Sequence, residues 1–392
     1  MKNIGVISRG IKTPIIKTGD NLPKIVVDSL ISASVEGQFS FNDRDVVGLT
    51  ESIVARVQGN YATLAQISTD VRRKTGGGTV GLVSPILSRN RFSLLLKGIS
   101  QGVDNLVIIL PYPKDEVGNA LFDSDLIDQL GVNPYSDVFE GDEIYSKFGK
   151  IEHPFTGIDY IALYKEYAPN CKIILANNFC EVLKYTDKVI CADIHTRAHT
   201  KKILKNSGAS LVLGLDDILT DSVDGSGYNK DFGLLGSNIS TDDSVKLFPR
   251  DCLPVVDKVA ELLFQQTGKH IEVMIYGDGA FKDPVGGIWE LADPMVSPAY
   301  TSGLVGTPNE VKIKFLADNS IGNLSGDLAK NAIVDLIKHK NSNLFGKKES
   351  LGTTPRRLTD LLGSLCDLTS GSGDKGTPVI LIQNYFSNYA DD

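Results

Sequence analysis

The residues best suited to chemistry lie in one stretch of the C-terminal half, Glu272–Trp289, with the sequence EVMIYGDGAFKDPVGGIW. Asp278 stands between two glycines, and Lys282 and Asp283 follow it closely. Two carboxylates, a lysine and glycines that let the backbone approach a ligand are the groups that a metal–phosphate site needs. A solvated turn in which Asp278 caps its own backbone would use the same residues. Both interpretations are open from these residues alone.

The residues around such carboxylates indicate how they are presented. Glu272–Tyr276 is an apolar run typical of a short buried strand, which places Asp278 at the carboxyl end of a strand. Ligands of α/β proteins bind at that end of parallel strands. A second buried run, Val107–Leu110, is followed by Asp115 and Glu116. The sequence therefore offers carboxylates after two separate strand ends.

The middle of the chain predicts a small parallel sheet, because three apolar runs alternate with helical segments. These runs are Lys172–Ala176, Lys188–Ala192 and Leu211–Gly214. Polar residues follow each run, and they could either form a binding edge or cap the next helices. They are Asn177-Asn178, Asp193 to Arg197, and Asp216-Asp217.

Composition excludes several classes of protein. A chain of 392 residues with 42% hydrophobic and 22% charged residues has room for two or three cores. Its net charge of −8 argues against a nucleic-acid partner. The 5 cysteines are odd in number and form no C-x-x-C pair, so neither a disulfide framework nor a zinc site is predicted. The N-terminus lacks the apolar region of a signal peptide and no apolar run spans a membrane, so we expect a cytoplasmic enzyme.

Motifs near the N-terminus resemble a known family. Thr13-Pro14-Ile15-Ile16-Lys17 is followed by Gly19-Asp20, then by Asp43 to Val47, Glu51-Ser52, Arg56 and Gly59. Their order and spacing resemble the N-terminal half of the coenzyme F-420 gamma-glutamyl ligase family. The resemblance implies that a guanine nucleotide is held by Thr13, Pro14, Ile15, Ile16, Glu51, Ser52 and Arg56. Without the resemblance, this segment would be interpreted as an edge strand, with Arg56 on a solvated helix.

A second stretch that resembles the family lies near the C-terminus. Leu358–Ile382 matches the family's helix, glycine-rich loop and strand without a gap. The loop consists of Ser370, Gly371, Ser372, Gly373, Asp374, Lys375 and Gly376. Its backbone N–H groups could surround the phosphates of a nucleotide, although a flexible surface loop would have the same composition.

The resemblance also implies metal ligands. Asp278 corresponds to a metal-ligating aspartate of the family. A second such aspartate corresponds most nearly to Asp104, with Asp115 or Glu116 as alternatives. Ser372 stands where the family has a metal-binding glutamate, and Asp374 is the nearest carboxylate. The arginines that follow the family's aspartate are replaced here by Lys282, Asp283 and Val285.

We therefore expect an α+β fold like that of coenzyme F-420 gamma-glutamyl ligase, interrupted by a small α/β insertion domain. The expected division is an N-terminal ligase-like segment, 1–119, the insertion, 120–270, and a C-terminal segment, 271–392, that completes the nucleotide and metal site. Both ends of the insertion lie close in sequence to the proposed metal carboxylates. We accordingly expect the insertion to cover the site and to bind the second substrate.

The resemblance implies a GTP-dependent amide ligase that forms a gamma-glutamyl bond. The nucleotide, GTP or ATP, and a divalent cation, Mg²⁺ or Mn²⁺, would convert a small-molecule carboxylate to an acyl phosphate, which an amino acid such as glutamate then attacks. Asp278, Lys282 and Asp283 are the expected catalytic residues, and a homodimer is expected. The replaced residues leave open a different class, a nucleotide or phosphometabolite binding protein that has lost ligase activity.

Overall fold

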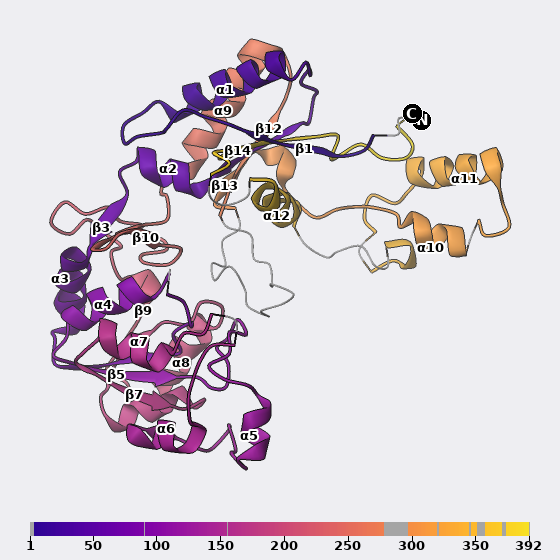
Figure 1. Ribbon diagram of the computed structural model, residues 1–392. Helices are drawn as coiled ribbons and strands as arrows, with labels where there is room; N and C mark the ends of the chain where they lie inside the picture. Colours follow the sequence, from indigo (N-terminus) through magenta and orange to yellow (C-terminus); the bar gives the residue numbers. More distant parts are fainter. Residues whose placement is uncertain are drawn as a thin grey trace.

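The computed structural model describes residues 4–89, 91–154, 156–277, 297–319, 321–344, 346–350, 357–370 and 374–391. Two globular bodies and a small helical lobe make up the chain (Figure 1). Helices and several sheets occur together, in keeping with the α+β class. No helix in the described parts of the chain combines the length and the apolar character needed to cross a membrane.

The first body is built on a five-stranded sheet that takes strands from both ends of the chain. In order across the sheet, the strands are β1 (Ile7–Ile11), β14 (Val379–Gln383), β2 (Val46–Thr50), β12 (Glu272–Tyr276) and β13 (Ala299–Tyr300). The pair β2 and β12 is parallel, whereas β14 is antiparallel to both of its neighbours.

Alternate residues of the central strands pack on opposite faces of this sheet, as the period of two in a strand requires. Val47 and Ile275 contact one core, shared with α1 (Leu22–Glu36) and α9 (Cys252–Thr267). Val46 and Met274 contact a second core, shared with α12 (Leu358–Ser370). Both faces are therefore covered, which explains why β2 and β12 are apolar at almost every position.

The second body contains a six-stranded sheet. In order, its strands are β6 (Phe139–Glu140), β7 (Cys171–Leu175), β5 (Asn105–Leu110), β4 (Thr79–Val83), β8 (Lys188–Cys191) and β9 (Leu211–Gly214). All neighbours are parallel except β6 and β7. The three apolar runs expected to form a parallel sheet are β7, β8 and β9.

Helices cover both faces of the six-stranded sheet. One core includes residues of α3 (Leu64–Thr75), α4 (Ser93–Gln101) and α7 (Tyr160–Tyr167), and the other includes residues of η1 (Phe179–Lys184) and α8 (Arg197–Asn206). Two short helices, α5 (Asp125–Gln129) and α6 (Asp142–Phe148), also belong to this body.

The bodies do not divide at the boundaries expected from the sequence. The strands β4 and β5 precede residue 120, yet they form the centre of the same sheet as β7 and β8. The main core of the second body runs from Ala62 to Leu247. Conversely, α9 lies within the expected insertion but packs on α1 in the first body. The physical reason is that a strand buried on both faces needs a hydrogen-bonded neighbour on each side, and motif order does not show which strands those are.

The chain crosses between the bodies twice, and the two crossings bond to each other. One crossing joins α2 (Glu51–Val57) to β3 (Tyr61–Thr63), and the other joins β11 (Ser244–Lys246) to α9. The Leu247 N–H donates to the Asn60 carbonyl at 2.8 Å, and the Asn60 amide donates to the Phe248 carbonyl at 2.8 Å. The antiparallel pair β3 and β11 extends this contact and, with β10 (Asn238–Thr241), forms a three-stranded sheet.

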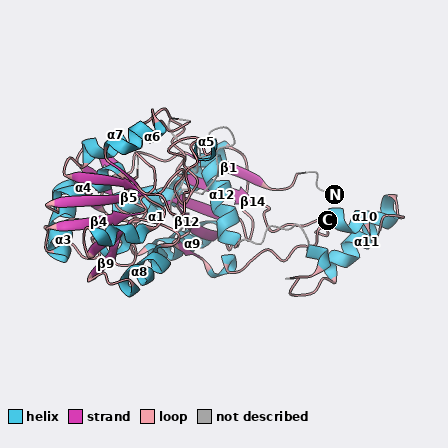
Figure 2. Ribbon diagram, turned by 90° about the horizontal axis from the view of Figure 1, so that it is seen from below, coloured by secondary structure: helices cyan, strands magenta, loops and turns pink. Residues whose placement is uncertain are grey.

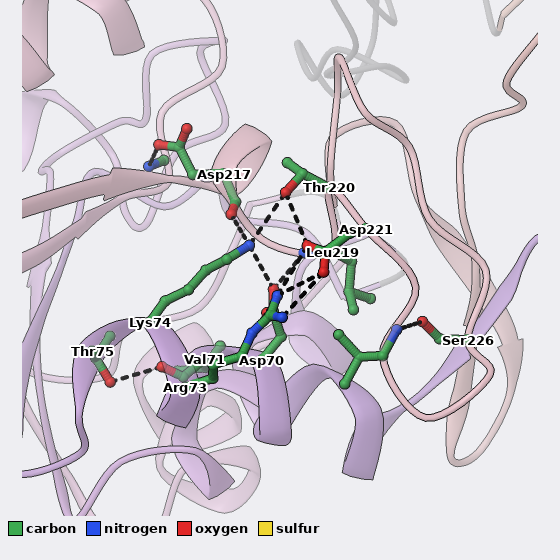
Figure 3. Close-up of polar contacts among 12 residues, drawn as sticks. Asp70, Val71, Arg73, Lys74, Thr75, Asp217, Leu219, Thr220, Asp221 and Ser226 are labelled. Atoms are coloured by element: carbon green, nitrogen blue, oxygen red, sulfur yellow. Dashed lines mark hydrogen bonds and ion pairs between the residues drawn. The ribbon is translucent and has the colours of Figure 1, made fainter.

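A buried carboxylate fixes the segment after β9 to α3 (Figure 3). Asp70 is fully buried and forms ion pairs with Arg73 at 2.6 Å and Lys74 at 2.8 Å. It also accepts a hydrogen bond from the Leu219 N–H at 2.7 Å. The long connection from β9 to β10 is thereby held against the second body, and β11 follows directly after β10.

The helical lobe stands apart from both sheets (Figure 2). It contains α10 (Ile313–Asp318), α11 (Gly326–Lys338) and the short turn η4 (Lys348–Ser350), and η3 (Ser302–Leu304) precedes it. A small core of its own, formed by Leu316, Ile321, Ile333 and Ile337, stabilises it.

Candidate functional site

Four chain segments converge on one edge of the five-stranded sheet. The register pairs Ile11 of β1 with Val379 of β14, and Val379 with Leu49 of β2. Thr50, which ends β2, lies beside Tyr276, which ends β12. The carboxyl ends of β1, β2 and β12 and the amino end of β14 therefore share this edge, which we call the ligase edge.

Most of the residues implicated by the sequence are next to the ligase edge along the chain. Thr13, Pro14, Ile15 and Ile16 follow β1; Glu51, Ser52 and Arg56 follow β2; Asp374, Lys375 and Gly376 precede β14. Asp278, Lys282 and Asp283 follow β12 in sequence and lie outside the described residues. Gly371, Ser372 and Gly373 also lie outside them.

The helix α2 begins as soon as β2 ends, and it carries three of these residues. Glu51, its first residue, is buried, whereas Arg56 is exposed near its end. Ser52 is half-buried, and its hydroxyl accepts a hydrogen bond from the ammonium group of Lys246. Within the described residues, the Arg56 side chain forms no ion pair.

Lys246, on β11 of the second body, is the residue of this region that the sequence did not single out. Burial lowers the pKa of Lys246; the carboxylate of Glu51 opposes this effect, and the positive charges of Arg56 and Arg91 add to it. A cation from each body and a carboxylate therefore lie near one ammonium group. In sequence, Lys246 is an ordinary polar residue between two apolar ones, and only the pairing of β11 with β3 brings it to α2.

The end of β12 adds a buried hydroxyl. Burial raises the pKa of Tyr276, and the neighbouring Cys366 thiol raises it further. Its hydroxyl lies close to Ser370, yet it makes no hydrogen bond of ordinary geometry among the described residues. Tyr276 directly precedes Gly277, the last described residue of this segment. A buried hydroxyl group that lacks a well-formed hydrogen bond within the described residues therefore lies at the end of β12.

The loop before β14 starts at the end of α12. The Ser370 hydroxyl donates to the Asp367 carbonyl at 2.9 Å, and the Ser370 carbonyl accepts from the Thr377 hydroxyl at 2.9 Å. Asp374 and Lys375 are exposed, and Gly376 has a φ of +66°, which favours glycine. The described part of this loop leaves its charged side chains in solvent at the ligase edge.

The segment after β1 also presents a side chain outward. Ile16 is buried in the core of the first body, but the side chain of Ile15 is 82% exposed. Thr13 and Pro14 line an open groove between β1 and α1. A single exposed apolar side chain is ordinary on a protein surface, so the exposure of Ile15 does not by itself identify a ligand.

The three other proposed metal carboxylates, Asp104, Asp115 and Glu116, lie in the second body. Asp115 and Glu116 are far from Asp104. Asp104 precedes β5, where it forms an ion pair with Arg72 at 2.8 Å that lowers the pKa of its carboxyl. Asp115 and Glu116 follow β5, so the length of that strand, roughly 15–20 Å, separates them from Asp104. Asp104 and its two alternatives therefore lie at opposite ends of β5.

Asp115 and Glu116 each hold neighbouring backbone. Asp115 is buried, which raises the pKa of its carboxyl, and it accepts from the N–H groups of Leu87, Val117 and Asn119 at 2.8–3.0 Å. Glu116 accepts from the Ile194 and His195 N–H groups that precede α8. Within the described residues, no group of three or more His, Cys, Asp or Glu side chains could hold a metal ion.

The polar residues after β7, β8 and β9 are likewise bonded within the fold. The Asn177 amide donates to the Tyr112 carbonyl at 2.6 Å. Arg197 pairs with Asp216 at 3.0 Å, and Lys201 bridges Asp216 and Asp217. These contacts favour a structural interpretation of that edge over a substrate-binding one, although Thr196, before α8, makes no side-chain cap bond.

Comparison with curated proteins gave no match to the chain. The model of a protein family does match it, over residues 10–384, and this span includes both bodies and the ligase edge. The N-terminal and C-terminal motifs thus belong to one continuous match that also includes the residues expected to be an insertion. The chain is a member of the F420-0:Gamma-glutamyl ligase family.

Proposed function

We propose that this protein is a nucleotide- and metal-dependent ligase that joins a small-molecule carboxylate to the amine of an amino acid such as glutamate. One observation carries the proposal: four strand ends that are remote in sequence, those of β1, β2, β12 and β14, meet at the ligase edge of a family member. Convergence at the carboxyl ends of parallel strands is typical of ligand sites in α/β proteins.

The residues at the ligase edge fit a phosphate-bearing ligand. Arg56 and Lys246 are cations with no ion pair among the described residues, and Lys246 is half-buried. Thr13 to Ile16 would contact the nucleoside, with the exposed Ile15 against the base. Glu51, Ser52 and the loop from Ser370 to Gly376 would contact the sugar and phosphates. GTP is the preferred nucleotide on family grounds, and ATP is the alternative.

The proposed reaction has two steps. A carboxylate oxygen of the acceptor attacks the terminal phosphorus; an O–P bond forms to give the acyl phosphate, and the bond to the nucleoside diphosphate breaks. The amine of the amino acid then attacks the acyl carbon, loses a proton, and displaces inorganic phosphate. Cations at the ligase edge would stabilise the charge of the phosphoryl group as it transfers.

A divalent cation, Mg²⁺ or Mn²⁺, would neutralise phosphate charge when bound. Asp278 and Asp374 are its proposed ligands, and Lys282 and Asp283 complete the proposed catalytic set. The described residues do not contain a full ligand set. Asp104, Asp115 and Glu116 bond elsewhere in the second body, so we leave them out of the proposed metal site.

The test uses the purified full-length chain with GTP or ATP, Mg²⁺ or Mn²⁺, glutamate and a panel of small carboxylic acids. Mass spectrometry would detect the amide, and a coupled assay would detect the nucleoside diphosphate. We expect diphosphate and amide in equal amounts, and only when acceptor and amino acid are both present. Nucleotide binding without any amide would instead establish the alternative, a binding protein that lacks ligase activity.

We also propose a homodimer. The strand β1 lies at the edge of the five-stranded sheet, and an open edge strand can pair with its copy across a two-fold axis. Sedimentation at micromolar concentration should give twice the chain mass of 42.4 kDa. A mass near that of a single chain would contradict the dimer.

A further inference from the structure

Lys246 reaches the ligase edge from the second body because of how the two crossings pair. In the antiparallel pair of β3 and β11, Lys246 lies opposite Tyr61. The next residue, Leu247, donates its N–H to the Asn60 carbonyl at 2.8 Å, and Arg250 donates its N–H to the Gln58 side chain at 3.1 Å. The second crossing is therefore bonded along the residues that follow α2. This pairing fixes the ammonium group of Lys246 on the hydroxyl of Ser52.

This position is unfavourable for a lysine unless an anion other than Glu51 binds beside it. Lys246 is half-buried, and its hydrogen-bond partner among the described residues is a neutral hydroxyl. A partly desolvated charge without an ion pair opposes folding. Burial lowers the pKa of Lys246; the Glu51 carboxylate opposes this effect in part, and the positive charges of Arg56 and Arg91 add to it. An apolar side chain of similar length would cover the same surface without the cost.

The charges around Lys246 specify the kind of ligand that would offset the cost. Two further cations, Arg56 and Arg91, and one carboxylate, Glu51, lie near enough to Lys246 to act on its charge. Together with that of Lys246, their formal charges sum to three positive minus one negative, an excess of two positive charges. An anion with two or more charges would fit this excess, and a carboxylate or a single chloride would not balance it.

We propose that Lys246 binds the terminal phosphates of the nucleotide, so that the nucleotide site is completed by the second body and not by the family motifs alone. The identity of the ligand, a nucleoside triphosphate, rests on the proposed function. The choice of Lys246 rests on the geometry described above. The Lys246 ammonium group would keep its contact with Ser52 and donate its other N–H groups to phosphate oxygens. The phosphates would then be held between α2 and β11.

Titration calorimetry on the full-length chain tests this inference with three variants. Lys246→Met removes the charge and keeps the length, and Lys246→Arg keeps the charge. Lys230→Met is the matched control, because Lys230 is an exposed lysine of the same body. The ligands are guanosine, GDP, GTP and inorganic tripolyphosphate, each with Mg²⁺. Circular dichroism would verify that every variant is folded.

We expect Lys246→Met to weaken GTP and tripolyphosphate by at least about tenfold, the effect of losing one charge-assisted hydrogen bond. Guanosine affinity should not change, since the nucleoside does not reach Lys246. The Lys246→Arg variant should stay within about threefold of the wild type, because the charge remains. Lys230→Met should bind every ligand as the wild type does.

The outcomes separate this inference from the proposed function. If Lys246→Met binds GTP as tightly as the wild type, the inference is overturned while the ligase proposal stands. If the wild type binds tripolyphosphate in a manner that requires Lys246 but forms no amide, the inference holds and the ligase proposal fails. If the wild type binds neither GTP nor tripolyphosphate, the inference is overturned.

Discussion

At the carboxyl edge of the six-stranded sheet, charged side chains bond to one another and to the backbone, whereas at the ligase edge two cations lack an anionic partner among the described residues. Asp115 accepts three backbone N–H groups, and Arg197 pairs with Asp216. Arg56 and Lys246 have no comparable contact. Both edges include the carboxyl ends of parallel strands and both are rich in polar residues, so composition and position alone do not distinguish them.

The difference supports the proposal that the ligase edge, and not the edge of the six-stranded sheet, binds a ligand. Polar groups that satisfy one another stabilise the fold, and a ligand would have to displace those bonds before it could bind. Cations that are held in place without an anion lower the stability of the fold, and binding of an anion removes this unfavourable contribution. Substitutions at the six-stranded edge and in its supporting network should therefore lower stability, and substitutions at the ligase edge should lower affinity.

The largest expected effect is on stability, at Asp70. Replacing this fully buried carboxylate by alanine would remove the ion pair of Lys74 and leave the Leu219 N–H without its partner. We expect Asp70→Ala to lower the free energy of unfolding by about 3 kcal/mol, as for a broken buried ion pair. Urea denaturation would measure it, with the exposed Asp187→Ala as a control that should change by less than about 0.5 kcal/mol. A loss for Asp70→Ala no larger than the control's would show that this network is dispensable.

Asp115→Asn should have the next largest effect. An amide has one acceptor oxygen in place of two, and its NH₂ group would face N–H donors that now point at a carboxylate. We expect a loss of about 2 kcal/mol in the free energy of unfolding, within the range for hydrogen bonds to a charged group. GTP affinity of the folded protein should not change. A variant of normal stability that binds GTP more weakly would return Asp115 to the list of metal ligands.

The strands of this fold could be predicted from the sequence, but their pairing could not. Apolar runs marked β5, β7, β8, β9 and β12 because strands buried on both faces are apolar at nearly every position. The same property makes such strands alike, so nothing in Val107–Leu110 shows that its neighbours are β4 and β7. The boundary expected at residue 119 fell inside a sheet for that reason.

The parts of the candidate site that local motifs form could be predicted from the sequence. The parts that depend on which strands pair could not. Thr13–Ile16 and Glu51–Arg56 lie directly after strands, so their motif order carried them to the ligase edge. Lys246 reaches Ser52 only through the register of β3 and β11, whose residues are remote in sequence. Asp104 was proposed as a metal ligand from a loose alignment, and it lies at the amino end of β5, opposite Asp115.

A smaller effect, on affinity, is expected at Arg56. This exposed guanidinium has no ion pair among the described residues, so Arg56→Ala should change the free energy of unfolding by less than about 0.5 kcal/mol. GTP affinity should fall about tenfold, because one charge-assisted contact to phosphate is lost. Titration calorimetry measures the affinity, and Lys205→Ala, at an exposed lysine of α8, is the control. Equal affinities for the two variants would place Arg56 outside the nucleotide site.

The smallest expected effect is a gain in stability at Lys246, and its dependence on pH identifies the cause. The folded state lowers the pKa of Lys246, so the folded protein binds this proton less tightly than the unfolded chain does. Below the lowered pKa the ammonium is charged in both states, and folding bears the full cost of burying it. As pH rises from the lowered pKa toward the usual 10.5, the folded protein loses the proton first and the cost disappears.

Lys246→Met should therefore melt at a higher temperature than the wild type at pH 7, and this difference in melting temperature should become smaller at alkaline pH. Lys246→Arg cannot lose its charge in this range, so its difference from Lys246→Met should stay constant. A Lys246→Met variant that is less stable than the wild type at pH 7 would show that Lys246 supports the fold, and the contrast between the two edges would then fail at its most informative residue.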